Sequence, residues 1–144
     1  MTTYVPSTLE IADDSPEAIA DLLDARGLGD GLPVVPPTPA RVDAMLAYAD
    51  GDPDEVLATL LPRAGIVTRR VVAINAVLAG CPPETFPVVL TAVRALARPE
   101  MNLRGVNATT HLVAPLVLVH GEIARTAGFS WGVGCFGPGN TANA

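Results

Sequence analysis

Four stretches in the first half of the chain place hydrophobic residues at recognisable spacings. Residues 15–27 open with serine and proline, carry an apolar stripe and end in glycine, which predicts a helix. Residues 38–46 predict a second helix behind a Thr-Pro start, and the Asp-Pro-Asp-Glu sequence at 52–55 predicts a third that carries the apolar residues of 56–61. Residues 32–35 predict a short buried strand or an extended arm, kept at an edge by the prolines that follow.

The second half is less polar. Residues 68–79 are apolar on most sides and predict a buried helix, and residues 84–97 predict a further helix. The run at 112–119 has the length and the β-branched residues of a strand, but Pro115 interrupts it, so we expect a bulged or edge strand. Residues 122–127 predict one or two helical turns.

Together these elements predict a mixed α+β fold, with a helix-rich N-terminal part followed by a strand and a glycine-rich terminal segment. A length of 144 residues allows at most one compact domain, and a hydrophobic content of 49% is enough to form a core. We expect an N-terminal helical extension over residues 1–27 and a single mixed α/β domain over residues 28–144.

Charge excludes several classes of function. The net charge is −6 and aromatic residues make up 4% of the chain, which disfavours nucleic-acid binding. The chain contains no lysine, so neither a Schiff-base lysine nor a phosphate-loop lysine is present. Most of the acidic residues lie in residues 1–61, whereas residues 62–144 carry more arginines than acids. Such a split indicates either a solvated acidic face or a face meant for a partner.

The remaining sequence signals predict a soluble, cytoplasmic protein without a cofactor. Cys81 and Cys135 form no Cys-x-x-Cys motif, and no His-x-x-x-His cluster occurs. The N-terminus lacks the features of a signal peptide, and no apolar stretch approaches the length of a membrane span. We therefore expect reduced thiols, with Cys81 a buried structural thiol at the end of a helix, and no association with membranes.

Two segments carry candidate chemistry. The first is the sequence from Asn107 to His111, directly ahead of the predicted strand. A histidine beside the hydroxyls of Thr109 and Thr110 can act as a general base, or it can simply bond a carbonyl. We take His111, Thr109 and Thr110 as catalytic candidates and Asn107 as a substrate-binding candidate.

The second segment is residues 132–144, which is rich in glycine and asparagine. Glycines allow backbone N–H groups to face an anion or an oxyanion. Cys135 is a candidate nucleophile, and Asn140 and Asn143 are candidates for hydrogen bonds to a substrate carbonyl. The substrate-binding candidates here are Gly134, Gly137 and Gly139. The Gly-x-Gly-x-x-Gly spacing lacks the strand and helix of a dinucleotide site.

A metal site is an alternative for the same residue types. Its ligands would be Cys81, His111, His120 and Cys135. His111 and His120 would lie about 30 Å apart if the residues between them are extended, too far for one metal ion. We therefore predict no metal ligand.

Four ordered blocks stand out in the sequence: DGLPVVPPT at 30–38, VAINAVLAGC with PETFPVVL at 72–90, NATTH at 107–111 and GPGNTANA at 137–144. These blocks resemble a poorly characterised bacterial family whose members often occur beside small thiol or selenol proteins with a U/C-Gly-Ser-Cys motif. The resemblance covers residues 28–144.

Chains of that family continue past the last block, usually with a threonine next. The resemblance therefore implies that this chain is the N-terminal half of a larger protein, either as a split subunit or as a cleavage product. In the second case the chain would be similar to fragments of hydrolases or transferases that cleave themselves before a threonine nucleophile, with Asn140 and Asn143 assisting the cleavage.

These observations predict a subunit of a heteromeric hydrolase or lyase that acts on a small molecule. The active site would lie at the interface with a second protein chain, between the segments 109–111 and 132–144. A non-catalytic assembly subunit and a self-cleaved fragment remain as alternatives.

Overall fold

The computed structural model describes residues 9–13, 15–28, 31–61, 63–136 and 139–143. The chain divides into two compact units, Met1–Pro36 and Pro37–Ala144. Within the described ranges it forms six α-helices, two short 3-10 helices and one sheet of two strands. The expected mixed α+β class with a helical bias is confirmed. Among the described residues, no helix combines the length and the apolar character needed to cross a membrane.

The first unit holds the predicted first helix, α1 (Pro16–Ala25). The hydroxyl oxygen of Ser15 accepts a hydrogen bond from the backbone N–H of Ala18 at 3.3 Å, so the serine caps the helix as its position in the sequence predicts. Ile19, on the apolar stripe, is buried.

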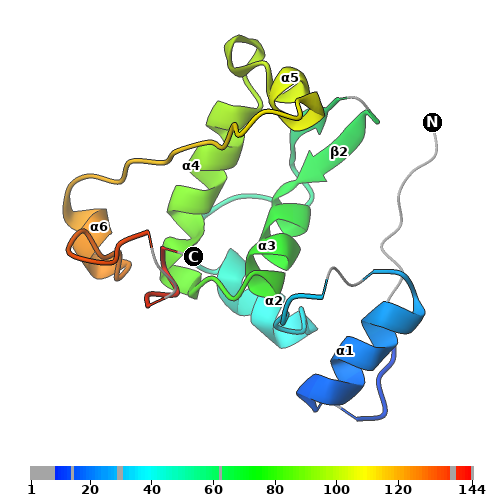
Figure 1. The fold of residues 1–144 in the computed structure, drawn as a ribbon. Helices are drawn as coiled ribbons and strands as arrows, with labels where there is room; N and C mark the ends of the chain where they lie inside the picture. The colour runs from blue at the N-terminus through cyan, green and yellow to red at the C-terminus, as the bar shows by residue number, and fades with distance from the viewer. Residues whose placement is uncertain (1–8, 14, 29–30, 62, 137–138, 144) are drawn as a thin grey trace. The chain divides into compact units, whose positions relative to one another are not determined.

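The core of the second unit lies among three helices, α2 (Pro39–Leu46), α3 (Arg69–Leu78) and α4 (Phe86–Leu96), of which α3 contacts both others (Figure 1). All three were predicted, and the caps that start α2 and α3 are threonines. The buried cluster consists of Val42, Met45, Val72, Ala73, Ala76, Val77, Phe86 and Leu90. Alanines at the centre of this cluster allow α3 to approach its neighbours closely.

The predicted third helix is wrong, because residues 56–60 form a strand. β1 (Val56–Leu60) pairs antiparallel with β2 (Gly65–Thr68), with Leu60 opposite Gly65. The acidic sequence ahead of β1 forms a turn, in which a carboxylate oxygen of Asp52 accepts the backbone N–H of Asp54 at 2.9 Å. Residues 56–60 form a strand and not a helix because they pair with β2, and a local sequence pattern does not reveal such a pairing.

Ion pairs join the turn before β1 to the start of α3. Arg69 is 5% exposed, and its Nη2 lies 2.6 Å from Oε2 of Glu55. The next residue, Arg70, binds both carboxylate oxygens of Asp54, with Nε 2.9 Å from the nearer one. Gly51, at a φ of +135°, lies directly against the Arg69 guanidinium, where a Cβ atom would overlap it. Because Arg69 is buried and Glu55 is half-exposed, removal of the Glu55 carboxylate would leave a buried guanidinium without its paired charge.

We predict that Gly51→Ala destabilises the protein by about 1–3 kcal/mol, because the substitution combines an unfavourable backbone angle with an overlap at Arg69. Urea denaturation measures the change in the free energy of unfolding. Gly65→Ala is the matched control, since Gly65 has an ordinary φ and open space around its Cβ position, and it should unfold like the wild type. Equal stability of the two variants would contradict the proposed contact.

Residues after the core are only partly as predicted. A 3-10 turn, η1 (Pro83–Thr85), leads into α4, which confirms the helix expected at 84–97. η2 (Pro99–Met101) and α5 (Leu103–Ala108) follow and were not anticipated. The predicted short helix at 122–127 is confirmed as α6 (Glu122–Thr126).

The strand predicted at 112–119 is wrong, and so is the strand alternative for residues 32–35. Residues 32–35 belong to no strand, in keeping with Pro33 and the prolines that follow, which cannot donate to a ladder, and the alternative of an extended arm remains. Residues 112–119 also belong to none, although the run has strand-forming residues. A strand needs a partner for its backbone, and no described segment pairs with residues 112–119.

Candidate functional site

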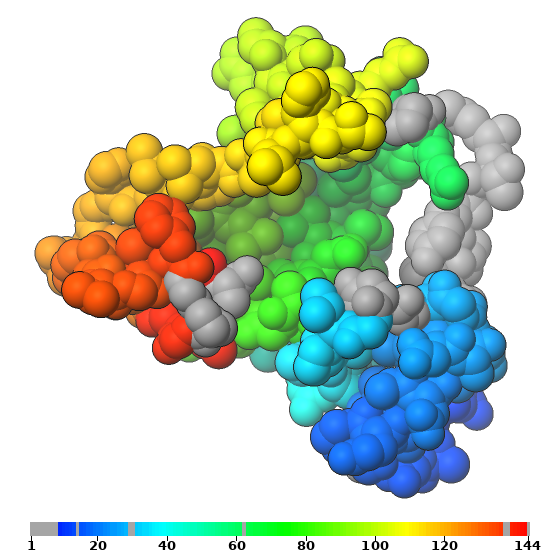
Figure 2. Space-filling view, viewed as in Figure 1, coloured from blue at the N-terminus to red at the C-terminus, as the bar shows by residue number. Residues whose placement is uncertain are grey.

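The most unusual surface of the second unit is the run from Leu112 to His120, which we call the exposed segment. It connects α5 to α6 and passes over α4 (Figure 1), and it forms the yellow-to-orange ridge in Figure 2. Leu112 is fully exposed, and Leu116 and Leu118 are 67% and 71% exposed. Large apolar side chains are seldom exposed in so continuous a run, and such patches mark interaction sites.

Most of the backbone of the exposed segment also lacks partners among the described residues. The N–H of Val113 donates to the carbonyl oxygen of His111 at 2.9 Å, at the start of the run. From residue 114 to residue 120 no backbone group pairs with another described residue. The segment therefore presents a row of open donors and acceptors, interrupted at Pro115, which has no N–H.

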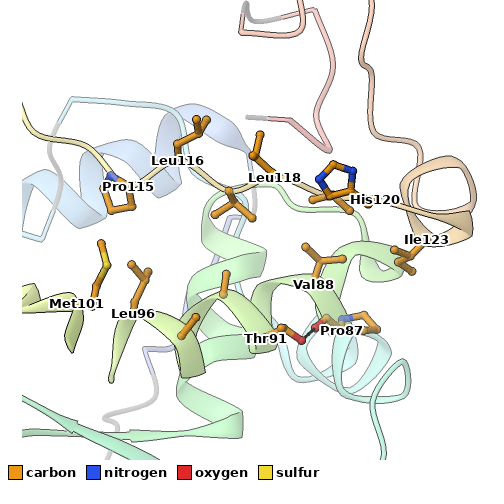
Figure 3. Close-up of a pocket in the computed structure, with 14 residues that line it drawn as sticks. Pro87, Val88, Thr91, Leu96, Met101, Pro115, Leu116, Leu118, His120 and Ile123 are labelled. Atoms are coloured by element: carbon orange, nitrogen blue, oxygen red, sulfur yellow. Dashed lines mark hydrogen bonds between the residues drawn. The ribbon is translucent and has the colours of Figure 1, made fainter. Parts of the chain in front are cut away.

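A groove of about 520 Å³ separates the exposed segment from α4 (Figure 3). Its walls are six residues of α4, Met101, residues 115–120 and Ile123. None of these residues is acidic or basic except His120, and the only other polar side chain is that of Thr91. The Thr91 hydroxyl donates to the carbonyl oxygen of Pro87 at 2.8 Å. The groove is thus apolar along most of its length.

The groove was not predicted from the sequence, although the apolar residues on two faces of α4 indicate a second packing surface. One face of α4 packs into the core through Phe86 and Leu90, while Val88, Ala92 and Ala95 lie on the groove side. A helix that is apolar on both faces must be covered on both. That pattern indicates a second packing surface on α4 beside the core.

The junction that precedes the exposed segment holds the first group of candidate residues. The backbone N–H of His111 donates to Oγ1 of Thr109 at 3.1 Å, which closes a short turn. His111 and Thr110 are exposed, Thr109 is half-buried, and Asn107 lies exposed on α5. The imidazole of His111 makes no hydrogen bond to a described residue, so its two nitrogens face solvent.

The second group of candidates lies in the loop after α6, where two asparagines hold the chain together. Asn143 donates from Nδ2 to the carbonyl oxygens of Ser130 and Cys135, both at 2.9 Å, and its Oδ1 accepts the Ser130 N–H at 2.8 Å. Asn140 donates from Nδ2 to the carbonyl oxygen of Gly128 at 2.9 Å and accepts from the backbone N–H of Ala142. Both carboxamides are therefore engaged by backbone groups, and their roles in catalysis or self-cleavage stay predictions.

The other predicted residues of this loop do not form one cluster with the junction. Cys135 is half-buried, and Gly134 is exposed at a φ of +82°. Gly139 is exposed, and Gly137 lies outside the described residues. An extended run of nine residues spans up to about 30 Å, and the exposed segment is such a run between the junction and α6. The structure does not bring the His111 junction and the Cys135 loop together.

Cys81 has the environment expected of a structural thiol. It is half-buried against the core after α3. Burial raises the pKa of the Cys81 thiol, and a hydrogen bond with Thr85 opposes that change in part. A raised pKa lowers the fraction of thiolate at neutral pH and therefore the reactivity of the sulfur.

A second, smaller hollow of about 320 Å³ lies between η1 and the loop after α6. Its lining includes Glu84, Thr126, Asn140 and Thr141. Glu84 accepts a hydrogen bond from the Tyr48 hydroxyl at 3.0 Å, and this bond raises the pKa of Tyr48. The hollow is polar and shallow, and its asparagine is already engaged by Gly128.

Neither the placement of possible metal ligands nor similarity to known proteins indicates what this surface binds. Over the part of the chain that the structure describes, no three histidine, cysteine or acidic side chains gather in a group that could hold a metal ion. The alternative ligands Cys81, His111, His120 and Cys135 are thus not assembled. Comparison with protein-family models, with curated proteins and with solved structures found no match to this chain.

We predict that Asn143→Ala loosens the loop after α6, because three hydrogen bonds to the backbone of Ser130 and Cys135 are lost, each contributing about 1 kcal/mol. Hydrogen exchange followed by mass spectrometry should show faster exchange in residues 128–136 and unchanged exchange in α3. Asn107→Ala is the control, since the exposed Asn107 should leave both regions unchanged. Unchanged exchange in Asn143→Ala would contradict a structural role for this side chain.

Proposed function

We propose that this chain is an assembly subunit that binds a second protein chain through the exposed segment. The observation that carries the proposal is that residues 112–119 carry mostly exposed apolar side chains, and that no backbone group of residues 114–119 pairs with another described residue. Either feature alone is common on protein surfaces. Their coincidence over residues 114–119 is the pattern of a strand whose neighbour belongs to another polypeptide.

The side chains of the exposed segment favour burial on both faces. In an extended chain, successive side chains point to opposite sides. Leu116 and Leu118 lie on one side and Val113 and Val117 on the other, and all four are exposed. A strand that is apolar on both sides is typical of the interior of a covered sheet. Complete burial of one leucine contributes about 1.5–3 kcal/mol, so a few such residues stabilise a specific complex.

The charge pattern agrees with a protein partner. No acidic or basic residue other than the two histidines occurs between Arg104 and Glu122. The buried centre of a protein interface is depleted of charged residues, while its rim is polar. Arg104 and Glu122 would lie at the two ends of the interface, where charges tune specificity at little energetic expense.

We propose that the partner adds a strand along residues 112–119. Addition of a strand to an open edge gives affinity through main-chain hydrogen bonds and specificity through side-chain pockets. Pro115 provides no N–H, so the pairing is interrupted there and divides into two short ladders.

Catalysis at this interface is a second candidate function, as a hydrolase or lyase acting on a small molecule. The exposed imidazole of His111 adjoins the start of the exposed segment, and the loop that holds Cys135 follows α6 at the other end. A partner that pairs along the whole segment would reach both groups. Because the two groups lie apart, either His111 as the proton-transferring group or Cys135 as the nucleophile would act in one site, with the complementary group supplied by the partner.

The assembly proposal is tested with the purified complex of this chain and its partner, identified by intact mass and reconstituted from the two isolated chains. We predict that binding slows hydrogen exchange at the amides of residues 113–120, because these N–H groups become paired. Leu116→Asp should weaken the complex at least tenfold by placing a charge in an apolar interface.

The matched control is Leu61→Asp. Leu61 is 55% exposed in the turn after β1 and receives the same chemical change outside the exposed segment. Its complex should keep the wild-type affinity. A wild-type complex in which the amides of 113–120 exchange as fast as in the free chain would refute the proposal, and so would equal affinities of the two aspartate variants.

The enzymatic candidate gives a separate prediction. In the two-chain complex, His111→Ala or Cys135→Ala should lower kcat at least a hundredfold on a panel of small esters and amides, because one of the two substitutions removes the reacting or proton-transferring group. Thermal unfolding should change little. Leu61→Ala is the control and should keep full activity, since Leu61 lies in the turn after β1, outside both segments. Intact activity with a large loss of stability would count against catalysis.

A further inference from the structure

We propose that residues 116–119 are a proteolytic processing site, at which an endopeptidase with an apolar specificity pocket cuts the chain when no partner covers the exposed segment. Hydrolysis of the Leu116–Val117 or the Leu118–Val119 peptide bond consumes one water molecule and leaves a new carboxylate and a new amino group. The cleavage site is a property of the free chain. Its protection by a partner rests on the proposed assembly function, and the two are tested separately.

The backbone of this stretch is accessible to an endopeptidase without prior unfolding. Such an enzyme binds its substrate as an extended strand, through the same main-chain pairing that an open sheet edge offers. Residues 114–120 lie outside every helix, strand and turn. No backbone group of these residues pairs with another described residue, so no backbone hydrogen bond has to break before cleavage. The local opening that limits the proteolysis of most folded segments is therefore not required here.

The side chains at the two peptide bonds suit an apolar specificity pocket. Leu116 and Leu118 are exposed, and Figure 3 shows both on the side of the segment away from α4. They can enter the pocket of an enzyme of the chymotrypsin type, which selects hydrophobic residues before the bond that it cuts. Pro115 precedes both bonds and directly follows neither, so its missing N–H and fixed φ do not block them.

Other exposed apolar residues are less suited to cleavage. Leu32 and Leu61 are exposed, but each directly precedes a proline, which has no N–H and too rigid a backbone for the position after the cut. Trp131 and Phe136 are exposed in the loop after α6, which the hydrogen bonds of Asn143 hold in a folded form. This loop would have to lose those bonds before it could become extended. The exposed segment is thus the favoured site.

The test is limited proteolysis of the purified chain with a trace of chymotrypsin under native conditions, followed by intact mass over time. We expect the first cut after Leu116 or Leu118, at least tenfold faster than at any other position. The double variant Val117→Pro/Val119→Pro places a proline directly after both bonds and should slow this cut at least tenfold. Neither valine donates a backbone hydrogen bond to a described residue, so the substitutions remove no hydrogen bond from the fold.

Val133→Pro is the control, since it makes the same chemical change at an exposed residue outside the segment, and its cleavage should match that of the wild type. In the reconstituted two-chain complex, cleavage at the two bonds should slow at least tenfold. A first cut elsewhere, for example after Leu28, would overturn the processing site, and so would wild-type cleavage of the double variant. Equal rates in the free chain and the complex would instead overturn protection by the partner and count against the assembly proposal.

Discussion

The burial of α3 between α2 and α4 is the constraint on which the rest of this unit depends. Ala73 and Ala76 let the helices approach closely, and Phe86 and Leu90 of α4 fill the space beside them. The core orients α4 through one of its apolar faces and leaves the other face toward the exposed segment. A helix with two apolar faces and one covering neighbour creates the groove as a direct consequence of the packing.

The exposed segment, like the second apolar face of α4, is incompletely covered. Its side chains suit a covered sheet, and its amides and carbonyls suit a ladder, yet the described residues provide neither on its outer side. In the proposed assembly, a second protein would supply both at once. The groove lies between this segment and α4.

Local signals in the sequence predicted the helices well, because each signal acts within a few residues. The hydroxyl groups of Ser15, Thr38 and Thr68 cap the helices that follow them, as the positions of these residues indicate. β1 was misjudged as a helix because its pairing with β2 depends on residues outside the local pattern. Residues 112–119 were misjudged for a related reason, since strand propensity is expressed only where a partner strand exists.

The catalytic roles of His111 and Cys135 stay predictions, and the sequence did not indicate how the loop after α6 and the groove are assembled. The hydrogen bonds of Asn140 and Asn143 to nearby backbone groups depend on the conformation of the loop, which glycine-rich sequence leaves open. The groove required α4 and the exposed segment to be placed side by side, so only the double apolar character of α4 was visible beforehand.

Pro115 has a consequence for the chain at high concentration. An open, uncharged strand is a template for edge-to-edge aggregation, and fibril-forming segments are usually six or seven residues long and free of proline. Pro115 divides the run 112–119 into three residues before it and four after it, each shorter than that length. Pro115 therefore disfavours the stacking of this exposed apolar run into fibrils, as gatekeeper residues do in other proteins.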